Sequence, residues 1–271
     1  MPFVLVDRPD PGVAVVTLNR PERMNAMAYD VMVPFRDALL ELGQDNAVRA
    51  VVVTGAGSGF CSGADQESAG VPPGVAGVTR PTYALRAMEA LEEVVLTIRR
   101  LHQPVVAAVN GAAIGGGLCL ALACDLRVAA PAAYFRAAGI NNGLTASELG
   151  LSFLLPRAVG STRAADIMLT GRDVTAEEAE RIGLVSSVHD DVVAAAVAIG
   201  QRIAGFSQPG TELTKKSLHA GQSATSLETY LSSEGIGQLY LRLLTGNFEE
   251  ATLARREGRE PRFTDDRPPG R

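Results

Sequence analysis

Three consecutive glycines, Gly115 to Gly117, mark the stretch of this sequence where backbone chemistry is easiest to foresee. They follow a short apolar run, Val105 to Val109, which is bounded by Pro104 and Asn110-Gly111 and is typical of a buried strand. They precede the run Leu118 to Cys124, which predicts a buried helix. A helix that begins directly after glycines presents free backbone N–H groups at its positive end, where an anion or an oxyanion can bind. Tight packing of strand on helix without a ligand is the alternative, and the stretch by itself leaves both open.

The elements before these glycines predict alternating strands and helices that end in a second glycine-rich turn. Phe3 to Asp7 and Val13 to Leu18 predict a hairpin. A helix is expected from Tyr29 to Gly43, and a buried strand from Val48 to Thr54. Strand, helix and strand in this order imply a parallel crossover. The second glycine-rich turn, Gly55 to Asp65, follows directly after that strand.

The remainder of the chain is predicted to be mostly helical. An amphipathic helix is expected from Thr82 to His102, a short strand from Leu126 to Ala129, and irregular chain from Ala132 to Thr145. Thr175 to Glu178 fits a capping box that would begin a helix. Later helices are expected at 190–206, 209–221, 225–245 and 247–257.

These elements divide the chain into three parts. Residues 1–200 form an α/β core that carries the site, and residues 201–263 form a C-terminal helical region. Residues 264–271 are charged and proline-rich, so we expect a disordered tail there.

Composition argues against several classes of function. A chain of 271 residues that is 46% hydrophobic can bury a large core, and its net charge of −5 argues against nucleic acid as a partner. The three cysteines and three histidines lack the spacing of metal ligands, so no metal site is predicted. The N-terminal segment does not resemble a signal peptide, and no apolar run approaches the roughly 18 residues that span a bilayer. We therefore expect a cytoplasmic protein that does not enter a membrane.

Four segments together match the motifs of one known family in order and spacing. They are Leu18 to Pro21 with Asn25-Ala26, Gly59 to Asp65, Pro104 to Asp125, and Leu169 to Arg172 with Glu178-Ala179 and Gly183 to Val185. With these motifs the chain resembles the crotonase family, the enoyl-CoA hydratase/isomerase superfamily, over about residues 3–263. The resemblance implies a spiral of repeated ββα units with a C-terminal helical trimerisation region, assembled as a homotrimer or hexamer.

The same resemblance implies an acyl-CoA thioester as substrate, with coenzyme A carried by the substrate and no separate cofactor. It assigns an oxyanion hole to the backbone N–H groups of Ala64 and Gly116. Two such donors would stabilise the enolate that forms when a thioester loses its α-proton, and one donor is typically worth about 3 kcal/mol.

The resemblance also outlines a groove for coenzyme A. By family position the groove is lined by Arg23, Met24, Ala26, Ser62, Asp65 and Gln66. Arg23 is the candidate for a CoA phosphate, and a solvated surface arginine is the alternative. Phe263 matches a family aromatic residue that would cover the adenine.

One departure from the family pattern bears on the reaction. Hydratases of the family hold a water between two glutamates, of which the first follows the triple glycine and the second lies twenty residues later. Here those positions, counted without gaps, are Cys119 and Gly139. Addition of water needs a base for the water and an acid for the α-carbon, and neither residue replaces a glutamate. A hydratase reaction of the usual kind is therefore not expected.

One carboxylate remains near the predicted site, that of Glu148, twelve residues before Gly160. Measured from that glycine, Glu148 matches the position where Δ3,Δ2-enoyl-CoA isomerases of the family carry their single glutamate. The resemblance implies that Glu148 removes a proton from C2 of a 3-enoyl thioester and returns it to C4. Thr145 to Glu148 also fits a capping box, so a purely structural role at a helix start is open as well.

We therefore expect an acyl-CoA enzyme that shifts a double bond, with Glu148 as acid and base and with Ala64 and Gly116 as oxyanion donors. Three alternatives remain. They are a hydratase that uses other groups, a dehalogenase-like or hydrolase-like enzyme in which Glu148 attacks the acyl group, and an acyl-CoA-binding protein without catalysis.

Overall fold

Short apolar runs form the parallel centre of a five-stranded sheet in the computed structural model, which describes residues 1–266. The strand order is β1 (Val4–Asp10), β2 (Val13–Leu18), β3 (Ala50–Gly55), β5 (Val105–Val109) and β7 (Leu126–Ala129). β1 pairs antiparallel with β2, which confirms the predicted hairpin, and the other neighbours are parallel. Every residue of β5 is buried because helices cover both faces of the sheet, as is usual for parallel strands.

A second sheet has the order β4 (Gly59–Cys61), β6 (Ala112–Ile114), β8 (Tyr134–Arg136) and β9 (Val174–Thr175). Each of its first three strands directly follows a strand of the larger sheet, so β3 and β4, β5 and β6, and β7 and β8 are successive turns of one spiral. The expected spiral fold is therefore confirmed. The prediction of irregular chain over residues 132–145 was wrong at β8, because a strand of three residues is too short to show periodicity.

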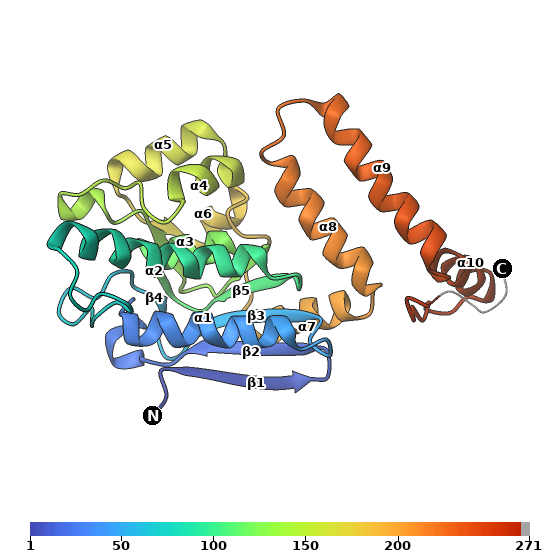
Figure 1. Cartoon of the computed structure of the whole chain (residues 1–271), viewed down its shortest axis with the longest axis horizontal. Coiled ribbons are helices and arrows are strands. Elements are labelled where there is room, and N and C mark those ends of the chain that lie inside the picture. Colours follow the sequence, from blue (N-terminus) through green and yellow to red (C-terminus); the bar gives the residue numbers. More distant parts are fainter. Residues whose placement is uncertain (267–271) are drawn as a thin grey trace.

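Helices enclose the spiral on both sides (Figure 1). They are α1 (Tyr29–Gln44), α2 (Arg80–Arg100), α3 (Gly116–Ala123), α4 (Leu151–Val159), α5 (Ser161–Thr170), α6 (Ala176–Arg181) and α7 (Val192–Ala204), with 3-10 turns η1 (Pro21–Arg23) and η2 (Ile140–Asn142). α7 packs on one face of the larger sheet, and α1, α2 and α3 share the main core on the other. α3 is apolar on every side and wholly buried, so it forms the centre of that core.

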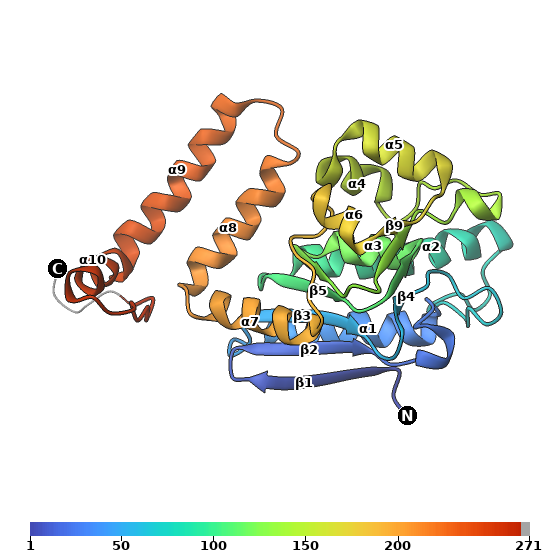
Figure 2. The ribbon, with the colours of Figure 1, turned by 180° about the vertical axis from the view of Figure 1, so that it is seen from behind.

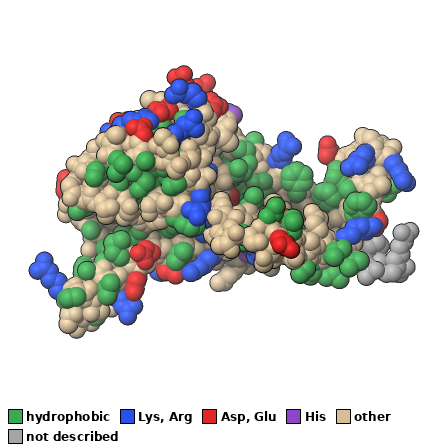
Figure 3. Space-filling model, turned by 90° about the horizontal axis from the view of Figure 1, so that it is seen from above, with side chains coloured by type: hydrophobic (Ala, Val, Ile, Leu, Met, Phe, Trp, Pro, Cys, Tyr) green, Lys and Arg blue, Asp and Glu red, His purple; other side chains and the backbone are tan. Residues whose placement is uncertain are grey.

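Three further helices form an arm that extends away from the spiral, α8 (Gln208–Gly221), α9 (Leu227–Leu244) and α10 (Asn247–Glu257) (Figure 2). They confirm the helices expected after residue 209. The boundary expected between residues 200 and 201 falls inside α7, and residues 267–271 of the expected tail lie outside the described chain. Large apolar side chains remain exposed along the arm, among them Leu231, Ile236 and Leu243 of α9 (Figure 3). Within residues 1–266 no helix is long and apolar enough to cross a membrane.

A buried ion pair fastens the arm to the spiral. The carboxylate of Asp125, next to the C-terminal end of α3, accepts hydrogen bonds from Lys215 Nζ at 2.9 Å, His219 Nε2 at 2.8 Å and the Val105 amide at 2.7 Å. Lys215 also donates to the carbonyl oxygens of Ile98 and Gln103. Burial opposes the ionisation of Asp125, but these hydrogen bonds and the Lys215 charge hold its pKa below the usual range.

Replacement of Lys215 by methionine tests this attachment. The substitution leaves the Asp125 carboxylate without its buried cation, so we expect the free energy of unfolding to fall by about 3–5 kcal/mol in urea titrations. The matched control is Lys216→Met on the exposed side of α8, which should change it by less than about 0.5 kcal/mol. Equal effects of the two substitutions would contradict the assignment.

Candidate active site

The two glycine-rich turns of the sequence lie in direct backbone contact. A Cβ added to Gly117 would lie 2.0 Å from the carbonyl oxygen of Cys61, and one added to Gly63 would lie 2.7 Å from that of Ile114. Gly63 also has φ of +85°, in the region that other residues rarely adopt. Only glycine permits this approach, so the contact fixes the chain after β4 against the start of α3.

Two unpaired backbone donors lie at this contact. Gly116 begins α3, and its N–H therefore has no partner within the helix. The Met27 amide donates to the carbonyl of Gly63, and the Asp65 amide donates to the carbonyl of Met27. These hydrogen bonds lie on either side of Ala64 and leave its N–H free. Neither amide has an acceptor among residues 1–266, and Ala64 is exposed. A Cβ on Gly63 would lie 3.5 Å from the Gly116 nitrogen, so the turn before Ala64 lies beside the second donor.

Two asparagine side chains hold the loop between β3 and β4 in place. Asn25 is fully buried. Its Oδ1 accepts from the Arg20 amide, and its Nδ2 donates to the carbonyl oxygens of Ala56 and Gly59. Asn110 joins the Gly55 amide to the carbonyl oxygens of Gly57 and Gly59. Both asparagines belong to motifs of the sequence, but this role could not be foreseen, because the loop oxygens that they bind lie more than thirty residues away.

Glu148 lies beside the same turn. Its Oε1 would be 3.1 Å from a Cβ added to Gly115, the residue before the Gly116 donor. The carboxylate is half-buried and accepts no hydrogen bond from residues 1–266, and burial raises its pKa above the ordinary value for glutamate. A group that stays available, partly desolvated and close to free donors has the properties of a catalytic base.

The local backbone explains how Glu148 reaches this place. Leu149 and Gly150 both have positive φ, 44° and 83°, which turns the chain before α4 begins at Leu151. For a branched residue such as Leu149 this conformation is strained, and strain of this kind is concentrated at functional sites. The capping box predicted from Thr145 to Glu148 does not form. Thr145 Oγ1 instead accepts from the Ser147 amide, and α4 has no side-chain cap.

The two positions that carry glutamate in hydratases cannot supply carboxylates here. The Cys119 thiol is fully buried and donates to the backbone carbonyl of Glu148 at 3.4 Å. Burial raises its pKa well above the ordinary value, which disfavours the thiolate that a nucleophile requires. A Cβ on Gly139 would lie 2.0 Å from the carbonyl oxygen of Thr145, so the backbone leaves no room for a side chain.

The expected groove for coenzyme A is organised by the Asp65 carboxylate. It is wholly covered, pairs with Arg20 at 2.8 Å and with Arg23 at 2.9 Å, and accepts the Glu67 and Ser68 amides. The pKa of Asp65 is held far below its usual range, and the hydrogen bond from the Ser68 backbone amide is the largest cause. Asp65 therefore positions Arg23, whose side chain is 30% exposed and also pairs with Glu67.

The other expected groove residues lie in two places. Met24 and Gln66 are exposed near Arg23, Ala26 is buried, and the Ser62 hydroxyl donates to the Arg23 carbonyl. Phe263 lies apart from them. It lines a cavity with residues of α7, α8 and α9. These helices lie away from β4, on the other side of the spiral (Figure 1). Within one chain, the structure does not bring Phe263 to the groove.

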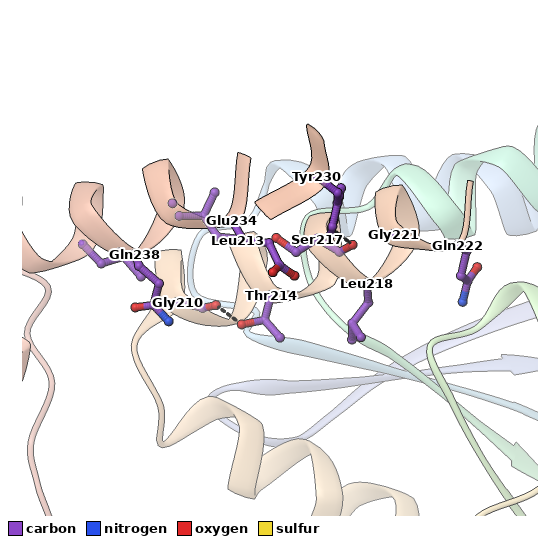
Figure 4. Close-up of a pocket in the computed structure, with 12 residues that line it drawn as sticks. Gly210, Leu213, Thr214, Ser217, Leu218, Gly221, Gln222, Tyr230, Glu234 and Gln238 are labelled. Atoms are coloured by element: carbon purple, nitrogen blue, oxygen red, sulfur yellow. Dashed lines mark hydrogen bonds between the residues drawn. The ribbon is translucent and has the colours of Figure 1, made fainter. Parts of the chain in front are cut away.

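A larger cavity between α8 and α9 is not a comparable site (Figure 4). Its volume is about 650 Å³, and its titratable lining residues are Tyr230 and Glu234. None of the residues around Ala64, Gly116 or Glu148 lines it. Residues 1–266 contain no group of three or more histidine, cysteine, aspartate or glutamate side chains that could hold a metal ion.

Comparison with known proteins agrees with this geometry. A family model described as enoyl-CoA hydratase/isomerase matches residues 8–266. A Mycobacterium bovis protein described as a "probable enoyl-CoA hydratase" is 68% identical over 97% of this chain and 93% of its own length.

Two solved structures are also similar. One is a "probable enoyl-CoA hydratase/isomerase" from Mycobacterium abscessus, with a TM-score of 0.95, 66% identity, and coverage of 98% of this chain and 100% of that one. The other is a monofunctional enoyl-CoA isomerase from M. smegmatis, with a TM-score of 0.73, 59% identity, and coverage of 85% of this chain and 99% of that one. The motifs, the spiral fold and these matches lead to one conclusion: the chain belongs to the enoyl-CoA hydratase/isomerase family, the crotonase superfamily.

Proposed function

We propose that this protein is an enoyl-CoA isomerase that converts 3-enoyl-CoA into 2-enoyl-CoA. The observation that carries the proposal is the position of Glu148, whose unbonded carboxylate lies against Gly115, directly before the free Gly116 amide. The M. smegmatis protein described as an isomerase, which is 59% identical, supports this proposal. The M. bovis relative is described as a hydratase, so the assays below measure both reactions.

In the proposed reaction Glu148 removes a proton from C2 of the 3-enoyl thioester. The electron pair of that C–H bond delocalises over the diene and the thioester oxygen, which becomes an oxyanion. The Ala64 and Gly116 amides donate to this oxygen. They need no reorganisation, because neither N–H is hydrogen-bonded to another group among residues 1–266. The protonated Glu148 then gives its proton to C4, the double bond forms between C2 and C3, and the carboxylate is regenerated.

The site favours this reaction over hydration because it holds one carboxylate near the oxyanion donors. Hydration needs one group to deprotonate water and another to protonate the α-carbon. Cys119 is buried beneath the backbone of Glu148, and Gly139 has no space for a side chain. An isomerase needs only one group that accepts a proton and returns it.

We further propose that coenzyme A binds beside Arg23 as part of the substrate, with no separate cofactor. The homotrimer or hexamer stays a prediction, and the exposed apolar residues of α9 support it as surface that a second subunit would cover. The cytoplasmic location and the absence of nucleic-acid partners also stay predictions from the sequence.

The Glu148→Gln variant tests the catalytic role. We expect turnover of 3-enoyl-CoA to fall by about a hundred- to ten-thousandfold, since the amide cannot take the C2 proton. Stability should not fall at neutral pH, because the folded protein disfavours the charged carboxylate and glutamine removes that charge. Spectrophotometric assays with 3-enoyl-CoA and 2-enoyl-CoA, together with thermal unfolding, measure both effects.

The outcomes of this experiment separate the alternatives. A loss of stability without a loss of turnover would assign Glu148 a structural role. Addition of water to 2-enoyl-CoA at an undiminished rate in Glu148→Gln would identify a hydratase that uses other groups. Tight binding of both compounds by the wild type without either reaction would indicate an acyl-CoA-binding protein.

The pH dependence of kcat/KM gives an independent test. Glu148 must be ionised to accept the C2 proton, and burial raises its pKa. The rate should therefore fall as the pH drops, with a midpoint above the ordinary pKa of a glutamate, and should level off on the alkaline side. The residual activity of Glu148→Gln should not show this fall at low pH. An unchanged fall in that variant would assign the titration to another group.

Arg23→Gln tests the place of the coenzyme A phosphates. Loss of a charged hydrogen bond should raise KM for the acyl-CoA by about tenfold while kcat changes little. The matched control is the acyl-pantetheine substrate, which lacks the nucleotide phosphates and should lose nothing in the variant. A similar loss with both substrates would mean that Arg23 acts only by holding Asp65 and its loop.

A further inference from the structure

A separate cavity at the far end of α3 carries an unbalanced positive charge. Its volume is about 310 Å³, and its charged lining comes from Arg99 of α2, Arg127 of β7, Arg157 of α4, His219 of α8 and Asp125. None of these residues contributes to the proposed reaction. Asp125 is the single carboxylate in the lining, and its two oxygens are already bound to Lys215, His219 and the Val105 amide.

The three arginines are held by neutral oxygens. Arg127 donates to the carbonyl oxygens of Leu184 at 2.8 Å and Cys124 at 2.9 Å. Arg99 donates to Oε1 of Gln222 at 3.1 Å, and Arg157 donates to the backbone oxygen of the same residue at 3.3 Å. Within the described chain, none of the three lies within ion-pair distance of a carboxylate.

This arrangement fixes the guanidinium groups without neutralising them. Buried or half-buried charges are normally paired, and here burial lowers the pKa of both Arg127 and Arg99. Nη2 of Arg127 and both Nε and Nη1 of Arg99 have no acceptor among residues 1–266. Guanidinium groups held in this way keep their charge and single N–H donors available to the oxygens of a phosphate.

We propose that this cavity binds a small phosphate-type dianion between the ends of α2, α3 and α4 and the arm. The ligand would be inorganic phosphate or the phosphoryl group of a small ester, and it would contact Arg99, Arg127 and Arg157. Because His219 and Gln222 lie at the C-terminal end of α8, the bound anion would also stabilise the attachment of α8 to the spiral. The proposal does not depend on the isomerase reaction.

Thermal unfolding of the full-length protein in phosphate, against chloride at equal ionic strength, tests the site. Phosphate should raise the melting temperature saturably in the wild type. Arg99→Gln and Arg157→Gln should each weaken the apparent phosphate affinity by about tenfold, as expected for loss of one charged hydrogen bond. Arg202→Gln, an exposed arginine of α7, should leave it unchanged.

The opposite results would overturn the proposal. These are no phosphate effect in the wild type, an equal effect in all variants, or an effect abolished by Arg23→Gln alone. Crystals soaked in tungstate provide a second measurement that does not depend on the variants. Tungstate bound among Arg99, Arg127 and Arg157 would support the site. A carboxylate of a second copy of the chain in the same place would show that the charge serves assembly and would overturn the proposal.

Discussion

The close contact between β4 and the start of α3 is the constraint on which the rest of the site depends. Gly117 lies so near the Cys61 carbonyl, and Gly63 so near that of Ile114, that any side chain at either glycine would collide with backbone. The contact is between elements of successive turns of the spiral, so it joins long-range topology to local chemistry. Its consequence is that two amides, at Ala64 and Gly116, end beside each other without acceptors.

α3 begins at this contact and ends beside the residues that hold the arm. It has only eight residues, from Gly116 to Ala123, and all of them are buried. Its N-terminal end presents the free Gly116 amide, the proposed oxyanion donor, and its C-terminal end is followed by Asp125, which fastens the arm through Lys215. A short, buried helix with a different charged environment at each end therefore connects the proposed catalytic site to the cavity of arginines. The helix dipole suits both ends, since it favours negative charge at the first and positive charge at the second.

Sequence patterns predicted those features whose causes are local. β5 was expected at its observed bounds because a fully buried parallel strand appears as a continuous apolar run, and the helices after residue 190 followed their periodicity. β4, β6 and β8 have three residues each and left no pattern. The pairing of Asp65 with Arg20 and Arg23, and the clash that keeps Gly139 bare, depend on contacts that only the folded chain creates. The resemblance to family isomerases pointed to Glu148, but whether it would cap a helix depended on the left-handed turn at Leu149 and Gly150.

The segment from Gly139 to Gly150 determines both the missing side chain at residue 139 and the position of the Glu148 carboxylate. Between Gly139 and Gly150 the chain folds back so that the Thr145 carbonyl fills the space that a side chain at residue 139 would need. That fold also brings the Glu148 backbone onto Cys119 and its carboxylate onto Gly115. The bare backbone at Gly139, the cover over the Cys119 thiol and the position of the Glu148 carboxylate therefore depend on the same loop conformation. Introducing glutamate at residue 139 alone would require the loop to move, and that movement would displace Glu148 from its place beside Gly115.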